Sequence, residues 1–277
     1  MKHTTLEKSS AYLCPRIISV ENRHVYYGGD QSWLPRNTAY KGGCAPVCGA
    51  NLLSVYADRN PQFQENLNIH VDEKHFIQQD EYLSMLQEIY STMRLREVPI
   101  LNHIYDNLSR SNRIFKRIPT NFGASLCHFT RGVLRYGLQK NINLQYRSRS
   151  TIFCSYTRGL TFIKLALANG YPVVLLTTNC KFPYLLHDRP YMHDGTQLHM
   201  HRHFVTITDI HESITGQGPE LVITTWGKTG TIAYRDLYHS WKSIRSFGSG
   251  MVYFIPAKNV KTTKRALMRA FTILIKR

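Results

Sequence analysis

Acidic residues are missing from a large part of this chain. Residues 107–187 contain twelve Lys and Arg but no Asp or Glu, and residues 237–277 contain nine Lys and Arg and again no acid. The chain of 277 residues carries a formal net charge of +17. A surface of one sign concentrates ligands of the opposite sign. The sequence therefore predicts a positive surface that attracts acidic peptides, nucleic acid or anionic lipid headgroups. The alternative is that these residues form solvated faces without a partner.

Long apolar runs and an export signal are also lacking. No stretch approaches the roughly 18 apolar residues of a membrane span, and residues 1–8 lack the hydrophobic region of a signal peptide. The six cysteines are irregularly spaced, which indicates reduced thiols and not a disulfide framework. We therefore expect a cytoplasmic protein without a transmembrane segment.

Metal-binding motifs are absent too. The sequence contains neither a His-Glu-x-x-His nor a Cys-x-x-Cys pattern. His199, His201 and His203 alternate, so on a strand they would share one face and could form a zinc site. The region before Phe204 has the composition of a loop, however, which favours a catalytic or merely polar segment. We expect no metal and no cofactor.

A cysteine stands at the predicted start of a buried helix. Gly42 and Gly43 interrupt the preceding structure, and Pro46 suits a first helical turn, where its missing N–H is not needed. Apolar residues then recur at steps of three, namely Val47, Ala50, Leu53 and Tyr56. Cys44 is therefore placed at the positive end of the helix, whose field favours the nucleophilic thiolate.

The other cysteines are interpreted as core residues. Cys48 lies one turn after Cys44, where the helix field is much weaker, and packing is favoured over a redox role. The remaining four stand among aromatic or β-branched neighbours: Cys14, Cys127, Cys154 and Cys180.

A base for the Cys44 thiol is predicted far downstream. Residues 203–207 are β-branched or aromatic after the initial His203, which indicates a strand with the histidine near its start. A second strand is predicted at 221–225, and Trp226 and Gly227 follow it. The sequence thus offers a helix-borne cysteine, a strand-borne histidine and a strand that ends in Trp-Gly.

These residues resemble the papain-like superfamily of cysteine peptidases, in particular bacterial peptidases of the bacteriocin-leader-processing type. Residues 43–53 are similar to the family's Gly-Cys-Gly-Pro element, 203–205 to its histidine strand, and 225–227 to the Ser-Trp-Gly that closes its sites. Residues 162–176 resemble the helix, turn and strand between them. The resemblance is carried by these four places, which are spread over residues 42–254. It implies an α+β fold, in which a helical half carrying the Cys helix packs on an antiparallel β-sheet half.

The resemblance also implies roles for three catalytic residues. Cys44 would be the nucleophile and His203 the general base. The third member of such sites is usually Asn or Asp, and alignment on Trp-Gly places Thr224 at its position. A hydroxyl orients an imidazole only weakly, so the substitution leaves a binding protein without turnover open as an alternative.

Three further residues are predicted to bind the oxyanion or the substrate. The family's oxyanion Gln stands six residues before the cysteine, and Thr38 occupies that position here, with Asn37 beside it. Trp226 is interpreted as a wall of the site. The implied partner is a peptide or protein substrate.

Periodicity predicts the remaining elements. Residues 1–41 have the composition of irregular structure and turns. Helices are expected over 75–95, 126–140 and 160–168, and strands over 142–145 and 171–177. No repeat or linker divides the chain, so we predict one α+β domain over 1–258. Residues 259–277 are predicted to form a basic amphipathic C-terminal helix, packed on the domain or lying on an anionic membrane.

Three functions remain open from the sequence. The first is a papain-like cysteine peptidase or related amide hydrolase that uses Cys44 and His203. The second is a catalytically degenerate binding protein with the same fold. The third is a basic protein that binds nucleic acid or an anionic membrane surface, in which the cysteine is incidental.

Overall fold

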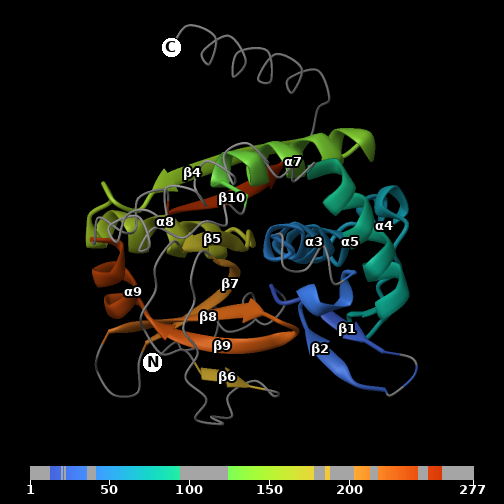
Figure 1. Ribbon diagram of the computed structural model, residues 1–277, viewed down its shortest axis with the longest axis horizontal. Coiled ribbons are helices and arrows are strands. Elements are labelled where there is room, and N and C mark those ends of the chain that lie inside the picture. Colours follow the sequence, from blue (N-terminus) through green and yellow to red (C-terminus); the bar gives the residue numbers. More distant parts are fainter. Residues whose placement is uncertain are drawn as a thin grey trace, which may run out of the picture.

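The computed structural model describes residues 13–19, 21, 23–35, 42–93, 124–177, 185–187, 203–212, 218–242 and 249–257. Among these residues are six α-helices and two β-sheets, which confirms the predicted α+β class (Figure 1). The predicted terminal helix at 259–277 lies outside the described residues, and the domain boundary at 258 stays a prediction.

The larger sheet has seven strands in the order β4-β10-β5-β7-β8-β9-β6, and every neighbouring pair is antiparallel. Its strands are β4 (Leu144–Ser150), β5 (Val173–Thr177), β6 (Leu185–His187), β7 (His203–Glu212), β8 (Pro219–Thr225), β9 (Lys228–Ala233) and β10 (Gly250–Pro256). All five residues of β5 are buried, as expected for a central strand made only of Val, Leu and Thr. The predicted strands at 171–177, 203–207 and 221–225 are thus present, with shifted ends.

A smaller sheet takes two of its three strands from residues 1–41, which were expected to be irregular. It consists of β2 (Val25–Tyr27), β1 (Arg16–Ile18) and β3 (Phe76–Gln78), in that order. Strand β1 pairs antiparallel with β2 and parallel with β3. Strands of three residues are too short to show the two-residue alternation by which strands are recognised. A short 3₁₀ helix, η1 (Gln31–Trp33), follows with Asp30 as its N-cap.

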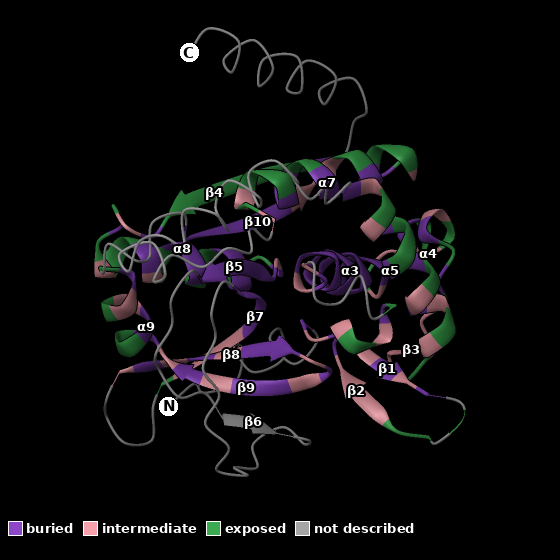
Figure 2. Ribbon diagram, in the orientation of Figure 1, coloured by how far each residue is buried: buried purple, intermediate pink, exposed green. Residues whose placement is uncertain are grey.

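Helix α3 (Cys44–Ala57) is the central element of the fold. Every residue from Ala45 to Ala57 is buried, and Figure 2 shows the helix in the purple of buried residues. It packs against α5 (Gln79–Met93), α7 (Leu126–Gln139), α4 (Pro61–Leu67) and strand β7. A helix that is apolar all round belongs in a core, whereas a surface helix shows one apolar face.

Helices α7 and α8 (Tyr156–Ala168) begin directly after serine N-caps. Helix α7 starts after Ser125, whose hydroxyl accepts a hydrogen bond from His128 N–H, and α8 starts after Ser155 in the same way. The cap explains why α8 begins four residues before the predicted position. The stretch 75–95, predicted as one helix, forms strand β3 and then helix α5, because its first residues pair with β1. Helix α9 (Tyr234–Trp241) completes the set.

One cluster of buried apolar side chains connects these elements. Its members range from Leu13 to Phe254 and come from both sheets and from all six α-helices. Within the described part of the chain, no helix combines the length and the apolar character that crossing a membrane requires.

Candidate functional site

Cys44 is the first residue of α3, as the sequence predicts. The chain reaches it through Gly42, whose φ of 109° lies in the region that favours glycine, and Gly43 is the N-cap. Pro46 lies in the first turn, and Ala45 N–H donates to the carbonyl of Gly42 at 3.2 Å. The cysteine is partly exposed, while the residues that follow it in the helix are buried. Cys44 is therefore the partly exposed end of an otherwise buried helix.

The electrostatic expectation for this thiol is wrong in its net direction. Burial raises the pKa of Cys44, because desolvation disfavours the thiolate. The backbone N–H groups of Phe204, Ala45 and Cys44 itself act in the opposite direction, but their effect is smaller. The helix start thus offers donors to the sulfur without making it a resting thiolate.

His203 is the first residue of β7, also as predicted. It pairs with Thr177 of β5, and its side chain is 7% exposed. Burial lowers the pKa of its imidazole to about 4, so the ring is neutral at pH 7. The ring stacks on Trp226, with centroids 4.6 Å apart and planes inclined by 25°. Trp226 thus forms a wall beside the histidine.

Cys44 and His203 belong to elements in contact. Helix α3 packs against β7, and the backbone N–H of Phe204, next to His203, stabilises the Cys44 sulfur as an anion. Among the described residues there is nevertheless no hydrogen bond from the Cys44 thiol to the His203 ring. The structure therefore places both residues in one region, and their action as a catalytic pair stays a prediction.

The hydroxyl that holds the His203 ring belongs to Thr225. Its Oγ1 lies 2.7 Å from His203 Nε2, and both side chains are buried. The role of ring partner was predicted for Thr224, but the Thr224 hydroxyl accepts from Asn51 Nδ2 at 3.5 Å. Successive residues of a strand point to opposite faces. Thr224 and Thr225 therefore cannot both face the ring.

Trp226 and Gly227 form the tight turn between β8 and β9. Thr225 pairs with Lys228, which leaves only two residues in the loop, and both have positive φ, 51° and 70°. This combination is required by a type I′ hairpin, although a bulky residue adopts it only when the surroundings hold it there.

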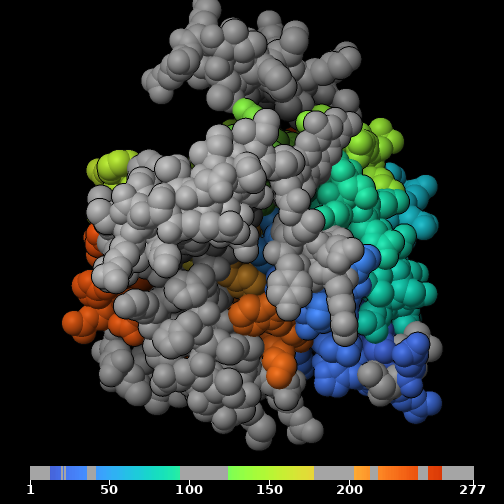
Figure 3. Space-filling model, viewed as in Figure 1, coloured from blue at the N-terminus to red at the C-terminus, as the bar shows by residue number. Residues whose placement is uncertain are grey.

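The surroundings of this turn come from the N-terminal segment. Tyr27 N–H donates to the Gly227 carbonyl at 2.8 Å, and Gly227 N–H donates to the Gly29 carbonyl at 3.0 Å. Figure 3 shows the orange surface of the hairpin directly beside the blue surface of residues near β2. The smaller sheet thus holds the wall of the candidate site in place.

Asn51 joins three parts of the fold beneath the site. Its Oδ1 accepts from Gly29 N–H at 2.9 Å and from the Tyr82 hydroxyl at 2.7 Å, and its Nδ2 reaches Thr224. The residue is 0% exposed. No role for Asn51 was predicted from the sequence. The available signal was an amide seven residues after Cys44, two turns on, within an apolar helix.

Other predicted residues lie outside the described part of the chain. This applies to Thr38 and Asn37, expected at the oxyanion, and to His199 and His201 of the alternative zinc site. Within the described residues, no three His, Cys, Asp or Glu side chains are arranged as a metal site.

The remaining cysteines differ from one another. Cys48 and Cys154 are buried, as predicted, but Cys127 is exposed at the start of α7, which the prediction of a core position missed. Burial raises the pKa of Cys48, so it is a packing residue and not a second nucleophile. Cys180 lies outside the described residues.

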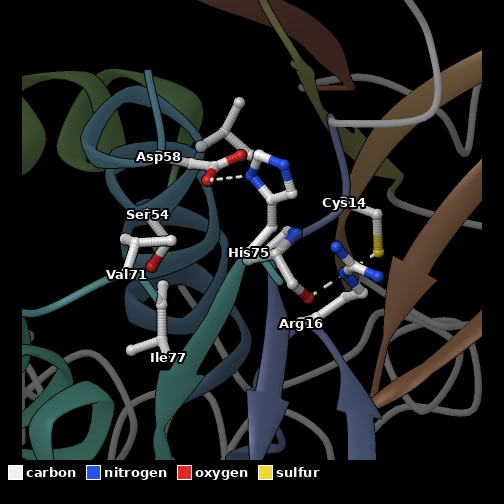
Figure 4. A pocket seen from close by; sticks show the side chains of 9 residues that line it. Cys14, Arg16, Ser54, Asp58, Val71, His75 and Ile77 are labelled. Carbon is white, nitrogen blue, oxygen red and sulfur yellow. Dashed lines mark hydrogen bonds and ion pairs between the residues drawn. The ribbon is translucent and has the colours of Figure 1, made fainter. Parts of the chain in front are cut away.

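A small cavity lies near the C-terminal end of α3 and is bordered by polar side chains other than those around Cys44 (Figure 4). His75 Nδ1 lies 2.7 Å from Asp58 Oδ1, and the buried Ser54 hydroxyl lies beside them without a hydrogen-bond partner in the described residues. Cys14 borders the cavity, but burial raises its pKa to about 12, so its thiol stays protonated at neutral pH. Ser54 follows Cys44 by ten residues, or ~15 Å along a helix. The cavity is therefore separate from the candidate site.

No protein-family model matches the chain, and no curated protein has a matching sequence.

Proposed function

We propose that the protein is a papain-like cysteine hydrolase that cleaves peptide or related amide bonds with Cys44 as nucleophile and His203 as general base. One observation carries the proposal. The first residue of the buried helix and the first residue of the strand packed on it are a cysteine and a histidine, about 160 positions apart in the sequence. Thr225 and Trp226 hold the histidine ring, so three chain segments converge at this place.

The directions of the two pKa shifts support proton transfer from a neutral Cys44 thiol to a neutral His203 imidazole. Cys44 is a thiol at pH 7 because burial raises its pKa, and His203 is neutral because burial lowers its pKa to about 4. His203 therefore has an unprotonated nitrogen at neutral pH. When Nε2 carries the proton and donates it to Thr225 Oγ1, the atom that acts as base is Nδ1.

The reaction then follows the chemistry of a thiol nucleophile. As Cys44 Sγ attacks the carbonyl carbon, its proton moves to His203, and a tetrahedral intermediate forms. The imidazolium returns that proton to the leaving amine as the C–N bond breaks, which leaves a thioester on Cys44. Water then attacks the thioester with His203 again as base, and the carboxylic acid and free thiol are released. Backbone N–H groups at the start of α3 can stabilise the oxyanion.

Proton transfer requires Cys44 Sγ to come within hydrogen-bond distance of the His203 ring. Hydrogen bonds between catalytic groups are often long in the absence of substrate and shorten in the complex. A rotation of the partly exposed Cys44 side chain is the smallest change that brings the sulfur towards the ring.

A peptide with a thiol-reactive epoxide tests the proposal directly. We expect one covalent adduct, located at Cys44 by peptide mapping, and loss of the adduct in Cys44→Ala. His203→Gln should slow its formation by at least about a hundredfold, in the range of general-base contributions. Cys48→Ala is the matched control one turn along the same helix and should keep the adduct. A folded protein that forms no adduct, or forms it equally fast without His203, would contradict the proposal.

A binding protein without turnover is the second candidate. It is favoured by the raised pKa of Cys44 and by a threonine hydroxyl as the partner of the imidazole. A fluorogenic peptide library separates the two candidates, because a binding protein retains peptides without releasing cleaved products. Its affinity would also be unchanged in Cys44→Ala.

A further inference from the structure

Among the described residues, strand β4 is an edge of the seven-stranded sheet, with no strand paired to its outer side. It occupies the end of the strand order and pairs with β10 along its whole length, from Leu144 opposite Pro256 to Ser150 opposite Gly250. The six residues after Leu144 are all exposed. The other long side of β4 is therefore a row of accessible backbone groups.

The ladder shows which backbone groups point to this open side. Ala257 N–H donates to the Asn143 carbonyl, and Thr151 N–H donates to the Ser249 carbonyl. Directly opposed residues of an antiparallel pair alternate between hydrogen-bonded and non-bonded pairs. The bonded pairs of β4 are therefore those of the odd-numbered residues. The N–H and C=O groups of Tyr146, Ser148 and Ser150 consequently point away from β10.

The side chains of β4 make one face of this edge basic. The Arg149 guanidinium lies over the Phe162 ring of α8, 5.6 Å from its centroid, so Arg149 is on the α8 side of the sheet. Arg147 shares that face, because residues two apart in a strand do. It is exposed, and it forms no ion pair within the residues that the structure describes. Tyr146 lies on the opposite face, with its ring 6.5 Å from that of Phe254.

We propose that β4 binds an extended acidic peptide segment by strand addition, with acidic side chains at alternate positions beside Arg147 and Arg149. The outward N–H and C=O groups of Tyr146, Ser148 and Ser150 pair with the backbone of the added strand. Alternate side chains of that strand lie on the arginine face, and charge complementarity selects acidic ones. The segment 107–187, which includes β4, contains no acidic residue that could compete for these arginines. This interaction is independent of the proposed catalytic function.

Other occupants fit the edge less well. In a symmetric pairing of two copies through Ser148, Arg147 of each copy stands opposite Arg149 of the other, and like charges directly opposite destabilise a strand pair. The chain's own segment 258–277 contains no acid and is repelled by the same arginines. Nucleic acid complements the charge, but it has no backbone that matches the spacing of strand donors and acceptors.

The probe is a fluorescein-labelled peptide in which Glu alternates with Val, titrated into the full chain and followed by fluorescence anisotropy. Its controls are the same peptide with Gln in place of Glu and one with N-methylated backbone positions. Ser148→Pro removes an N–H that points outward and leaves every hydrogen bond between β4 and β10 in place. It should weaken peptide binding by about tenfold or more. The control Ser148→Ala keeps this N–H and should bind the peptide as well as wild type. Arg147→Gln should weaken binding about threefold, and Arg131→Gln on α7 is its control.

Amide exchange locates the added strand even if a variant is unstable. Peptide binding should slow exchange at Tyr146, Ser148 and Ser150, while Arg147 and Arg149 are already protected by β10. The proposal is overturned if the Glu peptide does not bind at millimolar concentration, or if Ser148→Pro binds it as well as wild type. Equal binding of the Gln peptide, or protection confined to other strands, also overturns it. So does an oligothymidylate that displaces the peptide while exchange at the three amides stays fast.

Discussion

His203 Nε2 and Thr225 Oγ1 are 2.7 Å apart. The two residues are separated by 22 positions in the sequence and lie on the neighbouring strands β7 and β8. When Nε2 carries the proton and donates to Thr225, the other ring nitrogen, Nδ1, is the one that can accept a proton from a thiol. Trp226 covers the ring from one side. The position of this imidazole is therefore set by two consecutive residues at the end of β8.

The first prediction separates the two threonines. Thr225→Val keeps the shape of the side chain but removes the hydroxyl at the His203 ring, and it should lower the rate of epoxide adduct formation at Cys44 about tenfold. Thr224→Val removes a hydroxyl one residue away that faces Asn51, and it should change this rate less than about twofold. Second-order rate constants from mass spectrometry provide the comparison. Equal effects of the two substitutions would show that Thr225 has no particular role in orienting the ring.

The second prediction concerns the order in which cysteines react. Under limiting iodoacetamide near neutral pH, we expect Cys127 to react first because it is exposed, and Cys44 to follow because it is partly exposed. Cys48 and Cys154 should react last because they are buried. Peptide mapping after timed quenching checks the order, and Cys127→Ala isolates the Cys44 reaction. If Cys48 were labelled before Cys44, the accessible end of α3 would have to lie elsewhere.

The third prediction concerns stability at low pH. His203 has a pKa of about 4 in the fold, whereas an unfolded histidine has one near about 6.5. Between these values the unfolded chain binds a proton that the folded chain does not, so stability is fully present above the unfolded pKa and falls as the pH is lowered. This histidine should therefore destabilise the fold by about 2 kcal/mol between pH 7.5 and 5.

Urea unfolding of wild type and His203→Gln at several pH values measures this term. The glutamine variant lacks the titration, so its pH dependence over this range should be weaker by the same amount. Parallel curves for the two proteins would mean that His203 is not buried in its neutral form.

The fourth prediction concerns Asn51. Asn51→Leu leaves the buried N–H of Gly29 without its acceptor and leaves the Tyr82 hydroxyl with only its longer contact to the Val47 carbonyl, at 3.3 Å. It should therefore reduce the free energy of unfolding by about 3 kcal/mol. Tyr82→Phe removes the hydroxyl itself, so no buried donor is left without an acceptor. It should reduce the free energy of unfolding by about 1 kcal/mol. Urea denaturation of both variants and their double mutant gives the coupling. Additive effects would show that the two side chains do not share a hydrogen bond.

Local signals account for the elements that carry the candidate pair. Two glycines and Pro46 mark the start of α3, so Cys44 is recognised as its first residue without any tertiary information. A run of β-branched and aromatic residues likewise marks β7 from His203. The short strands of the smaller sheet carry no such signal, and each exists because a neighbouring strand pairs with it.

Pairing and burial decided the rest. The sequence alone establishes that two threonines precede Trp226, but only the register that sets Thr206 opposite Thr224 determines which hydroxyl meets the imidazole. Burial likewise reverses the expected direction of the Cys44 pKa, because desolvation depends on atoms from the whole fold, whereas the helix field is local. Local sequence signals thus specify which residues begin α3 and β7, whereas the partners and the protonation of Cys44 and His203 depend on how the whole chain packs.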